Sequence, residues 1–108
     1  MAIQFIGLTP SHTFVWLWRV QFTWDKIKEQ INRRKHGVGF ETVPQVFADP
    51  GRVLLADRKH SLTEGRFWCV GHDGHGILSV RFVLRAGVIR VIGAGYWRKG
   101  EKIYEEKS

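Results

Sequence analysis

The sequence predicts an α+β domain in which two N-terminal helices pack on a mainly antiparallel sheet, followed by a short C-terminal helix or tail. Apolar residues recur at helical spacing between positions 26 and 48, whereas they alternate with a period of two between positions 52 and 92. The turn-forming pairs Asp73-Gly74 and Ala86-Gly87 separate the last three predicted strands, as in an antiparallel meander. With 108 residues, 44% of them hydrophobic, the chain can form one core but not two.

An aromatic segment precedes the first helix. Aromatic residues on one parity between positions 14 and 24 predict a long strand, or an aromatic tail followed by a strand that begins near Val20. We therefore divide the chain into an N-terminal extension, residues 1–19, and a domain, residues 20–108.

Asp25 and Gly37 bound the first predicted helix, which covers residues 26–36. Asp25 is a favourable N-cap, and a glycine after the last turn can adopt the left-handed conformation that ends a helix. Because Ile27 and Ile31 are four residues apart, we expect them to form the buried stripe of this helix.

The second helix and the strands follow from shorter patterns. The helix is predicted over residues 40–48, where Pro44 is tolerated because it lies in the first turn. Its buried stripe is Val43, Val46 and Phe47, and the Asp-Pro-Gly turn at residues 49–51 ends it. The predicted strands cover residues 52–56, 66–71, 77–85 and 88–92, and residues 96–108 form the C-terminal helix or tail.

The net charge of +7 predicts a polyanionic partner: a nucleic acid, an acidic protein or an anionic membrane. A membrane span is not expected, because no apolar segment reaches the ~20 residues that one requires. Cys69 is the single cysteine, which excludes an internal disulfide and a cysteine-based zinc site. Cysteine usage therefore fits a cytoplasmic protein.

Arginines on the predicted strands are the first candidates for function. Arg66, Arg81 and Arg90 lie on strands of a sheet whose other face is covered, so several guanidiniums could form a phosphate site on the open face. The alternative is an ordinary solvated strand face.

His60, Glu64 and Arg66 lie within seven residues and offer a second candidate. An imidazole and a carboxylate can move protons, and an arginine can stabilise a pentacovalent phosphorane. RNA cleavage by the internal 2′-hydroxyl requires these three roles and neither a metal nor a cofactor. The alternative is a charged loop. His72 and His75 form an H-x-x-H pair but lack a third ligand nearby, which argues against a metal site there.

Basic and aromatic residues near the two helix ends complete the candidates. Lys35 and His36 end the first helix and could contact the RNA backbone, and Tyr96 lies beside a basic tail that includes Arg98 and Lys99. A nucleobase could stack on Tyr96 or on the neighbouring tryptophan, although core packing is the commoner fate of tryptophan in a small domain.

Motifs in a fixed order connect these candidates. They are Phe22-Thr23-Trp24-Asp25, Asn32, Lys35-His36-Gly37-Val38, Phe40-Glu41, Val46-Phe47-Ala48-Asp49-Pro50, Asp57, His60, Glu64-Gly65-Arg66-Phe67, Arg90-Val91-Ile92 and Glu101-Lys102-Ile103-Tyr104-Glu105. In their combined order and spacing they resemble the BrnT family of toxins from type II toxin–antitoxin systems. Residues 20–108 would then form a BrnT-like toxin domain.

The resemblance implies a fold similar to RelE-type ribonuclease toxins and RNA cleavage that halts translation. It also implies neutralisation by a BrnA-like antitoxin, a ribbon-helix-helix protein whose complex with the toxin binds operator DNA. The family pattern matches this chain at His60, Glu64, Arg66 and Arg90, which we take as candidate catalytic residues.

Two departures from the family pattern stand out. The family strand that ends similarly to Ile-Ser-Ala-Arg ends here in Ile92-Gly93-Ala94-Gly95, without its arginine. We hypothesise that Arg98 takes its place as a catalytic residue. Residues 1–19 precede the usual start of these toxins, as an added strand or an early start codon. The competing interpretation is a basic module that binds RNA or an antitoxin without cleaving anything.

Overall fold

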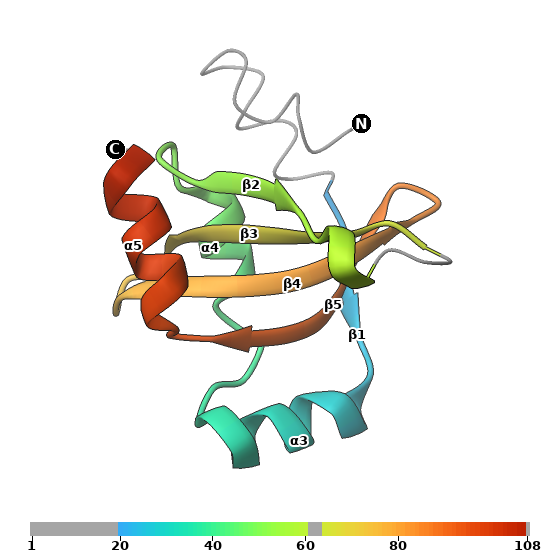
Figure 1. Cartoon of the computed structure of the whole chain (residues 1–108). Coiled ribbons are helices and arrows are strands. Elements are labelled where there is room, and N and C mark those ends of the chain that lie inside the picture. The colour runs from blue at the N-terminus through green and yellow to red at the C-terminus, as the bar shows by residue number, and fades with distance from the viewer. Residues whose placement is uncertain (1–19, 61–63, 108) are drawn as a thin grey trace.

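The computed structural model describes residues 20–60 and 64–107 (Figure 1). The predicted extension, residues 1–19, lies outside the described residues. The elements in chain order are β1 (Phe22–Trp24), α3 (Lys26–His36), α4 (Val43–Ala48), β2 (Val53–Ala56), a 3-10 turn η1 (Arg58–His60), β3 (Arg66–His72), β4 (Ile77–Arg85), β5 (Val88–Gly95) and α5 (Arg98–Lys107).

The strands form one five-stranded sheet in the order β1-β5-β4-β3-β2. The pairs from β2 to β5 are antiparallel, which confirms the predicted meander, and β1 pairs with β5 in parallel. A register shift lies between Arg81 and Phe82 of β4, whose partners on β5 are Gly93 and Val91. The sheet is therefore mainly antiparallel, as predicted.

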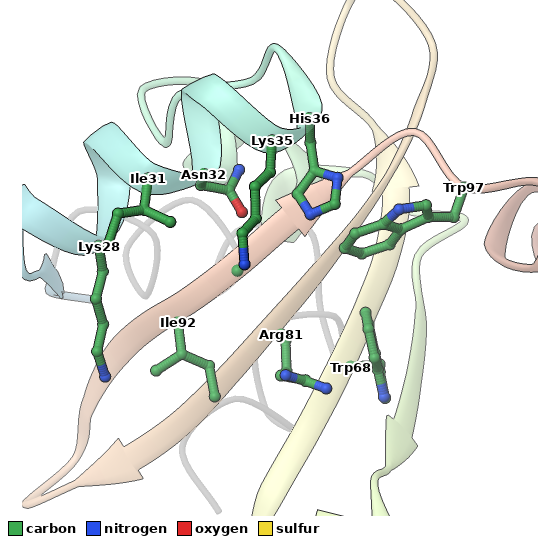
Figure 2. A pocket seen from close by; sticks show the side chains of 10 residues that line it. Lys28, Ile31, Asn32, Lys35, His36, Trp68, Arg81, Ile92 and Trp97 are labelled. Atoms are coloured by element: carbon green, nitrogen blue, oxygen red, sulfur yellow. The ribbon is translucent and has the colours of Figure 1, made fainter.

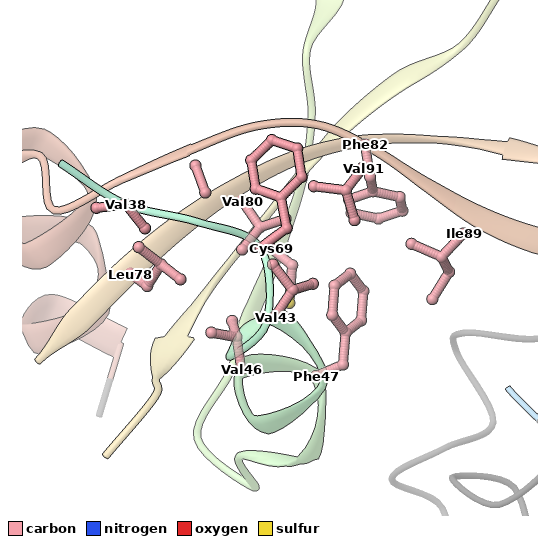
Figure 3. Packing of buried hydrophobic residues seen from close by; sticks show 12 residues of the cluster. Val38, Val43, Val46, Phe47, Cys69, Leu78, Val80, Phe82, Ile89 and Val91 are labelled. Atoms are coloured by element: carbon pink, nitrogen blue, oxygen red, sulfur yellow. The ribbon is translucent and has the colours of Figure 1, made fainter. Parts of the chain in front are cut away.

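The helix α4 covers one face of the sheet and builds the core there (Figure 3). Val43, Val46 and Phe47 are fully buried, which confirms the predicted stripe. The ring of Phe47 lies 5.1 Å from that of Phe82 on β4 and 5.3 Å from that of Phe22 on β1. Aromatic alternation in β1 thus provides side chains that reach the core from the edge of the sheet.

The helix α5 packs on the opposite face (Figure 1). Its buried residue is Gly100, where a Cβ atom would lie only 1.8 Å from Oγ of Ser79 and 3.6 Å from Cγ1 of Val70. Glycine at this position therefore permits the close approach of helix and sheet. The predicted alternative of a fraying tail is replaced by a ten-residue helix.

The predicted placement of both N-terminal helices on the sheet is wrong for α3. This helix lies beside β5 at the edge of the sheet (Figure 1), and its buried residue is Asn32. Ile27 and Ile31, predicted to be buried, are 66% and 45% exposed. Four-residue spacing identified a common helix face but not which side of the helix faces the protein, and hydrogen bonds from Asn32 decide that.

Asn32 fastens α3 to the end of β5. Its Nδ2 donates to the carbonyls of Val38, at 2.9 Å, and Ala94, at 2.8 Å, while its Oδ1 accepts from the N–H of Ala94 at 3.2 Å.

The predicted caps are confirmed: Asp25 Oδ1 accepts from the N–H of Ile27, at 2.7 Å, and Gly37 has φ of 70°. Within the described residues, no helix is long and apolar enough to cross a membrane.

Candidate nucleic-acid interface

The pairing of β3, β4 and β5 places the strand arginines on the face opposite α4. Arg66 and Arg90 are the direct partners of Val83 on its two sides, so the three side chains form one row across the sheet. Trp68 and Arg81 are direct partners in a neighbouring row. Residues two apart on a strand lie about 7 Å apart on the same face. The three arginines singled out from the sequence therefore share one face.

A cavity of ≈ 460 Å³ lies between this face and α3, and we call it the groove (Figure 2). From α3 it is lined by Lys28, Ile31, Asn32, Lys35 and His36, and from the rest of the chain by Trp68, Arg81, Ile92, Gly93 and Trp97. Figure 2 shows Lys28 and Lys35 extending from the helix toward the strands. The groove therefore has cations on both of its sides.

Arg81 is held in place by an acidic and an aromatic neighbour. Its guanidinium carbon lies 5.2 Å from the ring centroid of Trp68, and its Nε lies 3.6 Å from Oδ2 of Asp57. The side chain of Asp57 is only 8% exposed and that of Arg81 is 30% exposed. A planar guanidinium held between an indole and a carboxylate loses little side-chain freedom when it binds a phosphate.

Aromatic rings form one end of the groove. Trp97 meets Trp68 edge to face at 5.6 Å and meets the ring of His36 edge to face at 5.1 Å. His36 is exposed and lies in the last turn of α3. The arrangement places a titratable imidazole beside two rings on which a base could stack.

Glu64 lies with Arg85, toward the far end of β4. Its Oε2 and Oε1 accept hydrogen bonds from Nε and Nη2 of Arg85 at 2.8 and 3.0 Å. These hydrogen bonds lower the pKa of Glu64, and the charge of Arg66 contributes in the same direction. Glu64 is therefore an anion that holds Arg85, and a weak proton acceptor.

The remaining candidates are spread over other surfaces. His60 ends η1, and its side chain lies outside the described part of the chain. Arg98 is exposed at the start of α5 and does not line the groove, and Lys99 lines a different cavity. Tyr96 donates its hydroxyl proton to Oδ2 of Asp73, and burial together with this bond raises its pKa to about 12.

A family model described as a ribonuclease toxin, BrnT, of type II toxin–antitoxin systems matches residues 24–101, more than two thirds of the chain. The chain belongs to the BrnT family. Among curated proteins there is no match. The family consists of ribonuclease toxins of type II toxin–antitoxin systems. Membership therefore implies an RNA substrate and an antitoxin partner. RNA is a polyanion, which the cations on both sides of the groove would attract.

Some residues that line the groove could not be assigned to it from the sequence. Trp68 follows Arg66 by two residues on a strand, so alternation alone could have placed it on the same face. Lys35 was predicted from the sequence, whereas Lys28 was not, although it belongs to the same basic helix. Asn32 and Asp57 appeared only as parts of the family pattern, because their roles depend on partners that are distant in sequence.

The histidine pair beside the β3–β4 turn takes part in local hydrogen bonds. Nδ1 of His72 accepts from the N–H of Gly74, at 3.1 Å, and the N–H of His75 donates to Oδ1 of Asp73, at 2.8 Å. Within residues 20–60 and 64–107, no three His, Cys, Asp or Glu side chains gather as a metal site would require. Cys69 is buried in the core, where burial raises its pKa to about 12.

Proposed function

We propose that this BrnT protein cleaves RNA on the sheet face that borders the groove, using the 2′-hydroxyl of the substrate as the nucleophile and no metal. The carrying observation is the shared face of Arg66, Arg81 and Arg90, opposite α4. Arginine forks match the geometry of a phosphodiester and stabilise the charge that builds up on a phosphorane. Single-stranded RNA also gains from aromatic rings beside the cations, which Trp68 and Trp97 supply.

The reaction forms a bond from O2′ to phosphorus and breaks the bond from phosphorus to O5′. A base takes the 2′-hydroxyl proton and an acid gives a proton to O5′, leaving a 2′,3′-cyclic phosphate and a 5′-hydroxyl. His36 on the groove and His60 on η1 are the two histidines for these steps. The lowered pKa of Glu64 favours a histidine over this carboxylate as the base.

We further propose that a BrnA-like ribbon-helix-helix antitoxin neutralises the toxin in the cytoplasm and that the complex binds operator DNA. Ile27 and Ile31 leave an apolar stripe exposed on α3, beside Lys28 and Lys35 of the groove. An acidic, amphipathic antitoxin segment is complementary to this surface, and covering it would close the groove. Ile27→Glu should then weaken the antitoxin complex, which titration calorimetry would measure, while cleavage of RNA by the free toxin stays unchanged.

The decisive experiment incubates the purified protein with RNA in excess chelator and maps the ends of the products. We expect 2′,3′-cyclic phosphate ends, and a loss of at least about 100-fold in Arg66→Ala and Arg90→Ala. Arg34→Ala is the matched control, since it removes the same charge from an exposed position of α3 instead of from the sheet face that carries Arg66 and Arg90. Salt-dependent RNA binding without any cleavage would instead identify a non-catalytic binding module. Cleavage that requires added divalent metal would overturn the metal-free mechanism.

The physiological part of the proposal is translation inhibition. Induced expression without the antitoxin should arrest growth and protein synthesis, whereas Arg90→Ala should grow normally. Growth arrest that persists in Arg90→Ala, with the variant folded and abundant, would separate the toxicity from the arginines.

A further inference from the structure

A second cavity of ≈ 550 Å³ lies between α5, β2 and η1, on the other side of the tryptophan pair from the groove. Leu55, Val70 and Ile103 provide apolar lining, and Arg58, Lys59 and Lys99 contribute positive charge. A volume of this size is within the range of about 300–1,000 Å³ that is typical of small-ligand sites.

The tryptophan pair connects the two cavities. Trp68 and Trp97 line both, and they are the two residues that do so. Arg81 of the groove is fixed over Trp68, at 5.2 Å, and is paired with Asp57, which lines the second cavity. A phosphate bound to Arg81 therefore lies one aromatic ring away from the second cavity.

The chemistry of the second cavity matches a nucleotide. Indole rings and aliphatic side chains suit the faces of a base, and lysine and arginine suit the phosphate attached to it. An uncharged apolar ligand would leave the three cations unused, and an acidic peptide would gain little from the aromatic wall.

We infer that the second cavity binds the base of a nucleotide adjacent to the scissile phosphate and so sets the base preference of cleavage. The inference rests on the proposed function for its link to cleavage, although binding of a base can be tested without it. Arg81 of the groove contacts the phosphate, and the second cavity discriminates among the bases of the adjacent nucleotide.

The variant Ile103→Trp fills the second cavity. Ile103 is half-buried on α5 and does not line the groove, so the added indole occupies the space meant for the base. Ile27→Trp is the matched control, because Ile27 is exposed and lines neither cavity. Thermal unfolding of both variants establishes that each is folded before it is compared.

Titration with the four nucleoside 5′-monophosphates, followed by NMR at the indole N–H groups, tests binding. We expect saturable shifts of the Trp68 and Trp97 signals with at least one nucleotide, weakened about tenfold or more in Ile103→Trp and unchanged in Ile27→Trp. Equal binding by Ile103→Trp and the parent protein would overturn the inference. So would the absence of shifts with all four nucleotides.

Sequencing the cleavage products of a random RNA pool tests the link to cleavage. The parent protein should show a base preference at one position beside the cut, and Ile103→Trp should reduce that preference about tenfold or more while still cutting. An unchanged preference in Ile103→Trp overturns the role in specificity. Failure of the parent protein to cut any RNA would overturn the proposed function instead, and the nucleotide titration would then still decide whether the cavity binds a base.

Discussion

The indole of Trp97 lies against Gly95, so that a Cβ atom at position 95 would stand 2.5 Å from Cε2 of Trp97. The resemblance to the BrnT family leads us to expect an arginine at this position, at the end of the strand. The glycine and the tryptophan therefore go together, because only a residue without a side chain lets Trp97 fold onto the end of β5. In this chain an aromatic wall stands where a strand-end phosphate ligand is expected.

Replacing Gly95 by alanine should displace Trp97 and disrupt its contacts with Trp68 and His36. We expect a loss of about 1–3 kcal/mol in the free energy of unfolding, because the methyl group overlaps a ring that packs tightly. Gly93→Ala is the matched control, since its Cβ would have Asn32 Oδ1, at 3.9 Å, as its nearest neighbour. Urea unfolding and near-UV circular dichroism measure both effects. Equal stability of the two variants would show that Trp97 moves freely.

Asn32 should be worth far more to stability than its place on a polar helix suggests. Asn32→Ala leaves the carbonyls of Val38 and Ala94 and the N–H of Ala94 without their partner. We expect a loss of about 3 kcal/mol by urea unfolding, and faster hydrogen exchange at Ala94. Gln30→Ala, at an exposed position of the same helix, should change stability by less than about 0.5 kcal/mol. A small effect of Asn32→Ala would mean that water replaces the side chain.

The parts of the fold that depend on neighbouring residues could be predicted from the sequence. Asp25 and Gly37 act within one helical turn, and the meander follows from alternation and two turns, so both were predicted correctly. The orientation of α3 could not be predicted, because it depends on the contact between Asn32 and Ala94, which are 62 positions apart. Two isoleucines on one face were a weaker restraint than three buried hydrogen bonds.

The candidate site also combines features that local sequence patterns predict with features that depend on distant parts of the chain. Alternation suggested an open face for the strand arginines, but the row that Arg66 shares with Arg90 depends on the register of three strands. The partner of Glu64 was not predictable either, since Arg66 and Arg85 are both basic and only the fold decides which one the carboxylate reaches.

The acid limb of the pH–rate profile should not come from Glu64. Its pKa is lowered by Arg85, so the carboxylate is charged at every pH above its ordinary value of 4.5 and cannot titrate near neutrality. We expect Glu64→Gln to keep the acid limb of kcat/KM. Replacing the histidine that acts as the base, by His36→Gln or His60→Gln, should remove that limb. Disappearance of the limb in Glu64→Gln alone would return the role of base to the carboxylate.

The hydrogen bond from Tyr96 to Asp73 should make stability depend on pH at both extremes. Burial opposes the charge of Asp73, but hydrogen bonds from Tyr96, the N–H groups of His75 and Gly76, and Thr42 outweigh it and lower the pKa of Asp73 below 3.8. A depressed carboxyl pKa gives stability that is present above the unfolded pKa and is lost as the pH falls through the folded one. Tyr96→Phe should therefore cost about 2 kcal/mol at pH 7, and the difference should shrink below about pH 4.

At alkaline pH the same pair acts through the tyrosine. The pKa of Tyr96 rises from 10.0 to about 12, so its contribution is complete below the unfolded value and is lost as the pH rises toward the folded one. The parent protein should lose stability between about pH 10 and 12 by an amount that Tyr96→Phe does not show.

Thr42→Val is the matched control, because it removes a hydrogen bond of 3.2 Å to the same carboxylate without removing a group that titrates there. It should reproduce part of the acid effect and none of the alkaline one, as followed by urea unfolding across the pH range. An alkaline loss that is identical in Tyr96→Phe and the parent protein would assign that loss to other groups, with Tyr104, whose pKa is raised by Asp49, as the first to replace.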